Sequence, residues 1–307
     1  MNQRERFRGC LQGLAAGDAL GTTLEFCARG SFEPLTDMLG GGPFKLRPGQ
    51  WTDDTSMALC LATSLVECAG FDAKDQMQRY CRWADDGYLS STGACFDIGS
   101  TVRAALRQFQ RDGNAYAGST HPRSAGNGCI MRLAPIPMHY FPDLELVERF
   151  AGESSRTTHG AQECIDACRL FSRILCRALL GASKEEVLFA DRTAFTGAEQ
   201  IVEIARGNYA AKCEAQIRGS GYVVESLAAA LWCFARTDNF ADAVLAAANL
   251  GEDADTTAAI TGQLAGAHYG EAGIPSHWLE RLALRAEIVS LADRLPAQAR
   301  PPEAIEH

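Results

Sequence analysis

The sequence predicts an all-α fold in which many helices form a single compact domain. Apolar residues recur at spacings of three and four along most of the chain, which is the period of a helix with one buried face. Gly70, Gly181 and Gly251 follow such segments, as glycines at helix ends commonly do. Stretches in which β-branched or aromatic residues alternate with polar ones, the pattern of a strand, are scarce.

Helices are expected, from the N-terminus onward, wherever this period persists. The first lies near the start of the chain, two directly follow acidic segments, and the others fill the middle and the C-terminal third. Their apolar faces would pack together as the core. The apolar positions are Phe7, Leu11 and Leu14; Met57, Leu61, Leu65 and Cys68; Ile165, Cys168, Phe171, Leu175 and Leu179; Val223, Val224, Leu227, Leu231 and Phe234; Phe240, Val244 and Ala247; Ile260, Leu264 and Ala267; and Trp278, Leu282, Ile288, Leu291 and Leu295.

Two connections are long for a helical domain. They span residues 28–50, which include three consecutive glycines, and residues 113–127. Loops of that length are often functional. No internal repeat and no linker of biased composition divides the chain, so residues 1–307 are expected to form one domain with a short Pro/Ala-rich tail after Leu295.

The composition argues against several classes of protein. A formal charge of −9 without a Lys/Arg run disfavours nucleic acid and the membrane surface as partners. No apolar run approaches the roughly 18 residues of a membrane span. The cysteines form no Cys-x-x-Cys pair or zinc spacing, and many lie among apolar residues at helical spacing. We therefore expect free thiols and a cytoplasmic protein.

The sharpest chemical signal is an acidic segment at the start of a predicted helix. Asp53 and Asp54 stand between Thr52 and Thr55, immediately before the apolar helix that begins near Ser56. One such residue would suffice to accept the free amide hydrogens of a helix start. Two adjacent carboxylates repel each other unless a cation lies between them. The segment therefore fits either a helix cap or a metal site.

A second acidic segment repeats this arrangement near the C-terminus. Asp253 and Asp255 alternate before another apolar helix, and Thr256 adds a hydroxyl at its start. Carboxylates and hydroxyls, with no thiolate or imidazole nearby in sequence, select a hard cation such as Mg²⁺ or Mn²⁺. Four aspartates could hold two ions, which together would polarise a water and hold adjacent substrate oxygens. A di-metal phosphoesterase would use the same ligands.

Three motifs, in order and in spacing, closely resemble the ADP-ribosylglycohydrolase family. The resemblance covers about residues 5–295, the expected core of the domain. Within the family the chain looks most like the dinitrogenase reductase-activating glycohydrolases. The family motifs are Gly17-Asp18-Ala19-Leu20-Gly21 with Glu25, Trp51-Thr-Asp-Asp-Thr-Ser-Met57 and Gly251-x-Asp-x-Asp-Thr256, and the closer likeness rests on Gly40-Gly-Gly, Leu46-Arg-Pro-Gly-Gln50 and Asp97-Ile-Gly99.

The resemblance implies an all-helical hydrolase with two Mg²⁺ or Mn²⁺ ions in a cleft. Its substrate would be an ADP-ribosylated protein and its product ADP-ribose. ADP-ribosyl-arginine is the expected linkage, because Asp97 resembles an acidic residue near the ribose in arginine-directed members. Serine-linked or other adducts are alternatives, as is a non-catalytic protein that binds ADP-ribose.

The resemblance also assigns roles to individual residues. Ordinary structural roles are alternatives for some of them: a tight turn at Gly126 to Gly128, a helix cap at Ser100, a structural histidine at His159 and a packing aromatic at Tyr222. Two positions depart from the family pattern, namely Glu252, where glycine is usual, and Ser100, where the nitrogenase-regulating relatives have asparagine. The expected residues are Asp97 and Glu25 as catalytic groups; Ser100, Gly126, Asn127, Gly128, His159 and Tyr222 as substrate-binding groups; and Thr52, Asp53, Asp54, Asp253, Asp255 and Thr256 as metal ligands.

Overall fold

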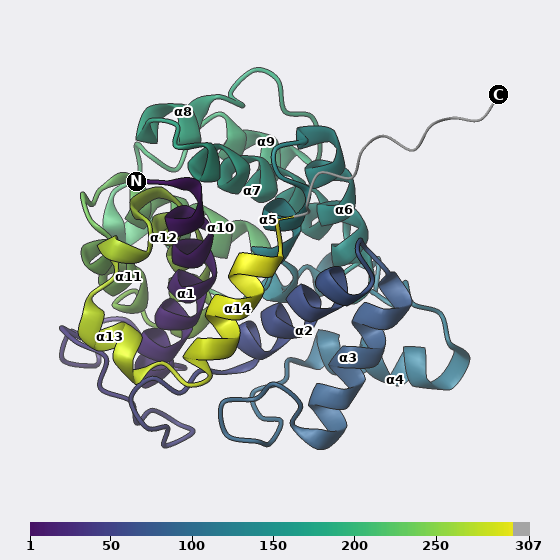
Figure 1. Cartoon of the computed structure of the whole chain (residues 1–307). Helices are drawn as coiled ribbons and strands as arrows, with labels where there is room; N and C mark the ends of the chain where they lie inside the picture. Colours follow the sequence, from purple (N-terminus) through teal and green to yellow (C-terminus); the bar gives the residue numbers. More distant parts are fainter. Residues whose placement is uncertain (297–307) are drawn as a thin grey trace.

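Two long helices, α1 (Gln3–Gly21) and α12 (Ala254–Tyr269), pack against each other along their whole length at the centre of the fold (Figure 1). Small residues at every fourth position let the two backbones touch. A Cβ atom added at Gly13 would lie 2.3 Å from the carbonyl oxygen of Gly262, and one added at Gly262 would lie 2.0 Å from that of Gly13. The helices run antiparallel, because the facing pairs are Gly9 with Gly266, Gly13 with Gly262, Gly17 with Ala258, and Gly21 with Ala254.

The computed structural model describes residues 1–296, in which helices and short 3₁₀ turns are joined by loops and no strand forms. The predicted all-α class is therefore confirmed. The elements are α1 (Gln3–Gly21), η1 (Thr22–Leu24), α2 (Asp53–Glu67), α3 (Ala73–Asp86), α4 (Ser100–Asp112), η2 (Pro122–Ser124), η3 (Asn127–Cys129), α5 (Pro135–Tyr140), α6 (Leu144–Arg156), α7 (Gln162–Leu180), α8 (Lys184–Phe189), α9 (Glu199–Ala205), η4 (Glu214–Gln216), α10 (Val223–Ala235), α11 (Phe240–Ala248), α12 (Ala254–Tyr269), η5 (Glu271–Gly273), α13 (Ser276–Arg281) and α14 (Arg285–Arg294).

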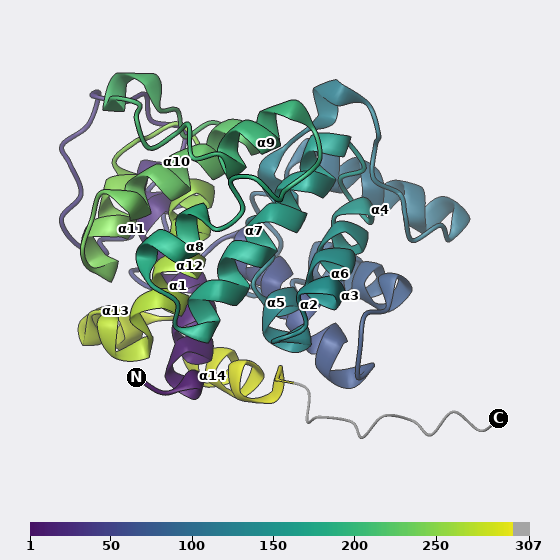
Figure 2. The same ribbon diagram turned by 90° about the horizontal axis from the view of Figure 1, so that it is seen from above.

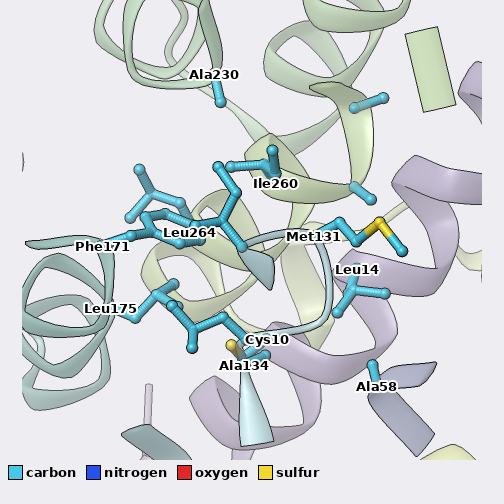
Figure 3. Packing of buried hydrophobic residues seen from close by; sticks show 14 of the residues in the cluster. Cys10, Leu14, Ala58, Met131, Ala134, Phe171, Leu175, Ala230, Ile260 and Leu264 are labelled. Atoms are coloured by element: carbon cyan, nitrogen blue, oxygen red, sulfur yellow. The ribbon is translucent and has the colours of Figure 1, made fainter. Parts of the chain in front are cut away.

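The remaining helices surround the α1–α12 pair. Helices α7, α10, α11 and α14 pack directly on one or both of its members. Helices α2, α3 and α4 form a neighbouring layer, and Figures 1 and 2 both place α4 on the opposite side of the molecule from α13. The apolar side chains meet between α1, α7 and α12, where Leu14, Phe171 and Leu264 are fully buried (Figure 3).

The C-terminal apolar pattern from Trp278 to Leu295 is interrupted rather than continuous. The chain leaves the helical conformation between α13 and α14, and Leu284 adopts a left-handed backbone conformation with φ of 52°. The amide of Ala283 donates a hydrogen bond of 2.9 Å to the carbonyl oxygen of Gly49. A contact with a distant loop therefore fixes the break, and a local pattern could not predict it.

Two other expectations concern the cysteines and the chain end. All twelve cysteines are free, as their sequence context predicts. No helix among residues 1–296 has the length and hydropathy needed to cross a membrane. The Pro/Ala-rich tail expected after Leu295 lies, beyond Pro296, outside the described residues.

The close approach of α1 and α12 predicts a strong effect of one added methyl group. Gly13→Ala places a Cβ against the backbone of α12, which cannot move without shifting the whole helix. We expect a loss of roughly 1–3 kcal/mol or more in the free energy of unfolding, measured by denaturant unfolding followed by circular dichroism.

Gly152 of α6 provides the matched control. A Cβ atom there would meet its nearest neighbour, a side-chain carbon of Ile165, at an ordinary 3.4 Å. Alanine is the better helix former, so Gly152→Ala should leave the stability unchanged or raise it slightly. Equal effects of the two substitutions would contradict the proposed packing of α1 on α12.

Candidate metal centre and active site

A cleft of about 640 Å³ opens where the C-terminal end of α1 meets the N-terminal ends of α2 and α12. The antiparallel packing of α1 and α12 produces this meeting, because it places η1 beside the start of α12. Most of the residues predicted to form the site line this cleft. The lining includes Glu25, Asp53, Asp97, Ser100, Gly126, Asn127, Gly128, His159, Asp253, Asp255 and Thr256.

The two acidic segments, far apart in sequence, meet at the base of the cleft. The hydroxyl oxygen of Thr52 lies 3.4 Å from Oδ2 of both Asp54 and Asp255. The hydroxyl oxygen of Thr256 lies 3.5 Å from Oδ2 of Asp54. Thr52 and Asp54 are buried beneath the cleft surface, whereas Asp53 and Asp253 border the open space.

Asp18, which we did not predict as a site residue, holds the first acidic segment in place. Its buried carboxylate accepts hydrogen bonds from the amide and hydroxyl of Thr52 at 2.8 and 2.9 Å. It also accepts from the amide and hydroxyl of Thr55 at 3.0 and 2.6 Å. The carboxylate that caps α2 therefore comes from α1, and α2 begins at Asp53 rather than near Ser56. Asp53 and Asp54 are left free for another role.

Glu25 holds the second acidic segment in place, as Asp18 holds the first. Its Oε2 atom accepts a hydrogen bond of 2.8 Å from the amide of Ala254, the first residue of α12. Glu25, Asp253 and Asp255 each offer a carboxylate oxygen, and these three oxygens lie within 4.8 Å of one another. This group has the chemistry and the spacing to hold a metal ion.

Burial and mutual repulsion make these carboxyl groups reluctant to ionise. Burial, followed by the charges of neighbouring carboxylates, raises the pKa of Asp54 and of Asp255 well above the usual range. The same causes raise the pKa of Glu25 to about 8 and that of Asp97 to about 7. Oδ1 of Asp54 is buried without any hydrogen-bond partner. A divalent cation would satisfy this oxygen and offset the repulsion, so the residues present fit such an ion.

Asp97 reaches the cleft through an unusual backbone conformation. Its φ of 59° lies in the left-handed region, which non-glycine residues adopt at some energetic cost. Ser100 follows at the first turn of α4, is exposed and lines the cleft, while Gly99 occupies the N-cap position. The side chain of Ser100 is therefore not the cap of α4.

The glycine loop at residues 126–128 was expected to bind substrate, but two of its backbone amides are bonded within the protein. The amide of Gly126 donates to the carbonyl oxygen of Ser124 at 2.8 Å, and the amide of Asn127 donates to that of Gly221 at 3.1 Å. These two amide hydrogens are therefore not available to a phosphate. The side chain of Asn127 donates instead to Oδ2 of Asp253 at 2.8 Å, which positions that carboxylate.

His159 packs against this glycine loop at the wall of the cleft. A Cβ atom at Gly128 would lie 2.9 Å from Cε1 of His159, so the ring requires glycine at that position. Nδ1 of His159 lies 2.8 Å from the hydroxyl oxygen of Thr158. Burial lowers the pKa of His159 to about 4, so the imidazole is neutral at physiological pH.

Tyr222 lies next to the main cleft rather than in it. It borders an adjoining hollow together with Arg123 and Gly126, and Gly126 also lines the cleft. Its side chain is 36% exposed, and its hydroxyl donates to Oε1 of Glu163 at 2.8 Å. Tyr222 is thus not a packing aromatic of the helix core.

The chain is similar to known proteins along nearly its whole length. A family model described as ADP-ribosylglycohydrolase matches residues 1–304. Two proteins named ADP-ribosylarginine hydrolase Tri1, from Serratia proteamaculans and Pseudomonas putida, are 43% and 45% identical to this chain over 95% of its length, and the matches cover 79% and 78% of their own lengths. The ADP-ribosyl-[dinitrogen reductase] glycohydrolase of Rhodospirillum rubrum is 33% identical over 92% of each chain.

The chain is also similar to a solved structure titled ADP-ribosylglycohydrolase-related protein complex. The TM-score is 0.85 and the sequence identity 43%, over 95% of this chain and 97% of that one. The sequence identity is thus higher to the Tri1 proteins than to the enzyme named for dinitrogen reductase.

The crowded carboxyl groups predict that the metal-free protein loses stability as the pH rises. Folding raises their pKa above the value near 4 of an unfolded chain. The stability that they contribute is therefore full below about pH 4 and is lost as the pH passes about 7 for Asp97 and about 8 for Glu25. In the presence of a chelator, the melting temperature should be lower at about pH 8.5 than at about pH 6.

Two comparisons test the cause of this pH dependence. Mg²⁺ or Mn²⁺ at about a hundred times its dissociation constant should stabilise the protein by roughly 2–3 kcal/mol. Glu25→Gln keeps an oxygen for the amide of Ala254 but removes one titrating group, so it should reduce the pH dependence of the chelated protein. A chelated protein that is equally stable at both pH values would contradict the crowding of these carboxyl groups.

Proposed function

Because this chain belongs to the ADP-ribosylglycohydrolase family, a family of hydrolases, we propose that it removes ADP-ribose from modified arginine side chains of proteins. Two relatives with over 40% identity are named ADP-ribosylarginine hydrolases. The observation that carries the proposal is the meeting of the two acidic segments at one cleft, where Thr52 lies 3.4 Å from both Asp54 and Asp255. The protein would thereby reverse mono-ADP-ribosylation.

We propose that the cleft holds two Mg²⁺ or Mn²⁺ ions. The ligands would be Thr52, Asp53 and Asp54 from the start of α2, and Asp253, Asp255 and Thr256 from the start of α12. When bound, the ions would supply positive charge that acidifies a water molecule and attracts the hydroxyls of the distal ribose. This ligand set contains only oxygen atoms, which favours hard cations over zinc.

The protein groups around the cleft supply orientation and proton transfer. Asp97 projects from its left-handed turn and would accept a hydrogen bond from a ribose hydroxyl, which orients the anomeric carbon toward the attacking water. Glu25 uses Oε2 to cap α12, so Oε1 is the oxygen that would accept a proton from that water. The proton would then pass to the departing guanidine nitrogen as the bond to the anomeric carbon breaks.

The remaining residues would bind the nucleotide part of the substrate. The neutral ring of His159 and the backbone of Gly128 form a wall of the cleft next to the acidic base. Gly126 connects this wall to the hollow beneath Tyr222. An extended ADP-ribose could therefore place its distal ribose near the carboxylates, and its adenine against Tyr222.

The direct test measures free ADP-ribose released from an arginine-ADP-ribosylated protein, with Mg²⁺ or Mn²⁺ and with chelator. Metal-dependent release is expected. A serine-linked substrate is tested in parallel, and release from that substrate alone would overturn the arginine assignment. Binding of ADP-ribose without release from either substrate would favour a non-catalytic binding protein. Release of phosphate instead of ADP-ribose would identify a phosphoesterase.

Substitution of one ligand from each acidic segment should abolish this activity. Asp53→Ala and Asp255→Ala each remove a carboxylate from the proposed centre, and we expect kcat/KM to fall at least about 100-fold. Circular dichroism should show an unchanged helical fold. Asp86→Ala, at the exposed end of α3, is the matched control and should keep full activity. Wild-type rates in both ligand variants would refute the metal centre.

Tyr222 offers a separate test of the nucleotide position. Tyr222→Ala removes the ring and should raise the dissociation constant for ADP-ribose roughly 5-fold or more, as expected for the loss of a base-stacking contact. Tyr222→Phe removes only the hydrogen bond to Glu163 and should bind almost as the wild type does. Isothermal titration calorimetry measures both. An unchanged dissociation constant in Tyr222→Ala would place the adenine elsewhere.

A further inference from the structure

Three phenylalanines from separate loops form a row at the cleft. The ring centroids of Phe26 and Phe44 are 6.3 Å apart, and those of Phe44 and Phe96 are 5.3 Å apart. Phe26 lines the cleft directly, next to Glu25. Phe96 immediately precedes Asp97, whose carboxylate lines the same space. This aromatic row, comprising Phe26, Phe44 and Phe96, therefore lines the cleft through Phe26 and is adjacent in sequence to both proposed catalytic residues, Glu25 and Asp97.

Phe26 is the unusual member of the aromatic row. Its side chain is 68% exposed, and its φ of 63° is rare for a bulky residue. A single exposed phenylalanine is unremarkable, but one that also occupies a costly backbone conformation beside a cleft indicates a functional constraint. Glycine or asparagine would adopt this conformation with less strain.

The backbone around Phe26 is held in place by the second acidic segment. The amide of Phe26 donates to the carbonyl oxygen of Glu252 at 2.8 Å, and the amide of Glu252 donates to that of Cys27 at 2.7 Å. Phe44 supports the ring from the side, in an edge-on arrangement with planes 74° apart. The backbone at Phe26 is therefore held by hydrogen bonds, and its ring lines the cleft in contact with Phe44.

The charge around the aromatic row selects its ligand. The carboxyl groups of Glu25, Asp53, Asp97, Glu252, Asp253 and Asp255 line the cleft, and that of Asp54 lies beneath it. Two divalent cations would leave this group net negative, so the space next to Glu25 and Asp97 favours another cation. A planar cation that also stacks on an aromatic face is a guanidinium group.

The nucleotide is expected at the other part of the cleft. The hollow of Tyr222 joins the main cleft through Gly126 and Gly221, whereas Phe26 borders only the main cleft, beside Glu25. A substrate with its distal ribose over the carboxylates and its adenine toward Tyr222 would direct the acceptor side chain toward Phe26.

We propose that Phe26, supported by Phe44 and Phe96, is the acceptor-binding residue that stacks on the guanidinium plane of the ADP-ribosylated arginine. The inference rests on the proposed function and adds a determinant of acceptor specificity to it. Phe26 does not take part in the chemistry. It binds the acceptor side chain beside Glu25 and Asp97.

The experiment compares a substitution that removes the aromatic face with one that keeps it. Phe26→Leu keeps an apolar side chain but removes the ring, whereas Phe26→Trp keeps an aromatic face. Steady-state kcat and KM are measured on ADP-ribosyl-arginine with Mg²⁺, and the dissociation constant of ADP-ribose is measured by calorimetry. Leu180→Ala, at an exposed apolar position outside the cleft lining, serves as the control.

We expect Phe26→Leu to raise KM about 10-fold, the effect of losing a partly desolvated cation–π contact, while kcat stays near the wild-type value. Phe26→Trp should restore KM, and neither variant should change the affinity for ADP-ribose, which has no guanidinium group. Leu180→Ala should match the wild type throughout.

Three results would overturn the inference. If Phe26→Leu has the wild-type KM, the aromatic face does not bind the acceptor. If it weakens ADP-ribose binding as much as it raises KM, the ring serves the nucleotide instead. If the wild-type protein releases no ADP-ribose from the arginine-linked substrate, the proposed function itself fails, an outcome seen before any variant is compared.

Discussion

The backbone contact between α1 and α12 brings together the two acidic segments of the candidate centre. Their antiparallel packing brings the end of α1 to the start of α12, as the facing pair Gly21 and Ala254 shows. Asp18 and Glu25, at that end, then reach across to the first turns of α2 and α12. Each acidic segment is thus positioned by a carboxylate that belongs to another part of the chain. Bulkier residues along this interface would separate the helices and with them the two halves of the cleft.

The cleft concentrates negative charge at a considerable energetic cost. Hydrogen bonds from the helix starts offset only part of this cost. Amide groups at the starts of α2 and α12 donate hydrogen bonds to Asp18 and Glu25, which partly offset the cost of burying these carboxylates. Oδ1 of Asp54 accepts no hydrogen bond, and burial raises the pKa of Asp54 well above the usual range. A bound cation would relieve the repulsion between these carboxylates, and this relief would contribute to the affinity for the ion. The arrangement that destabilises the metal-free protein is therefore the one that suits it to retain ions.

The sequence was sufficient to predict those parts that depend on local patterns. Apolar periodicity indicates the helices that carry Leu14, Phe171 and Leu264, and the alternation of Asp253 and Asp255 indicates a ligand segment. The apolar segments did not include helices α3–α6, α8 and α9, which are either short or rich in polar residues. Contacts across the fold explain the other differences. Asp18 was overlooked because its partners are distant in sequence, and the amide of Asn127 is taken by a carbonyl group nearly a hundred residues away.

In the turn that carries Phe26, the backbone and the side chain have different roles. Its backbone is hydrogen-bonded to Glu252, next to the second acidic segment, while its side chain lines the cleft and packs edge-on against Phe44. The side chain can therefore change without disturbing the main-chain bonds that hold the segment. In evolutionary terms, this is a position from which new acceptor preferences can arise in one step, while the hydrolytic machinery is inherited intact.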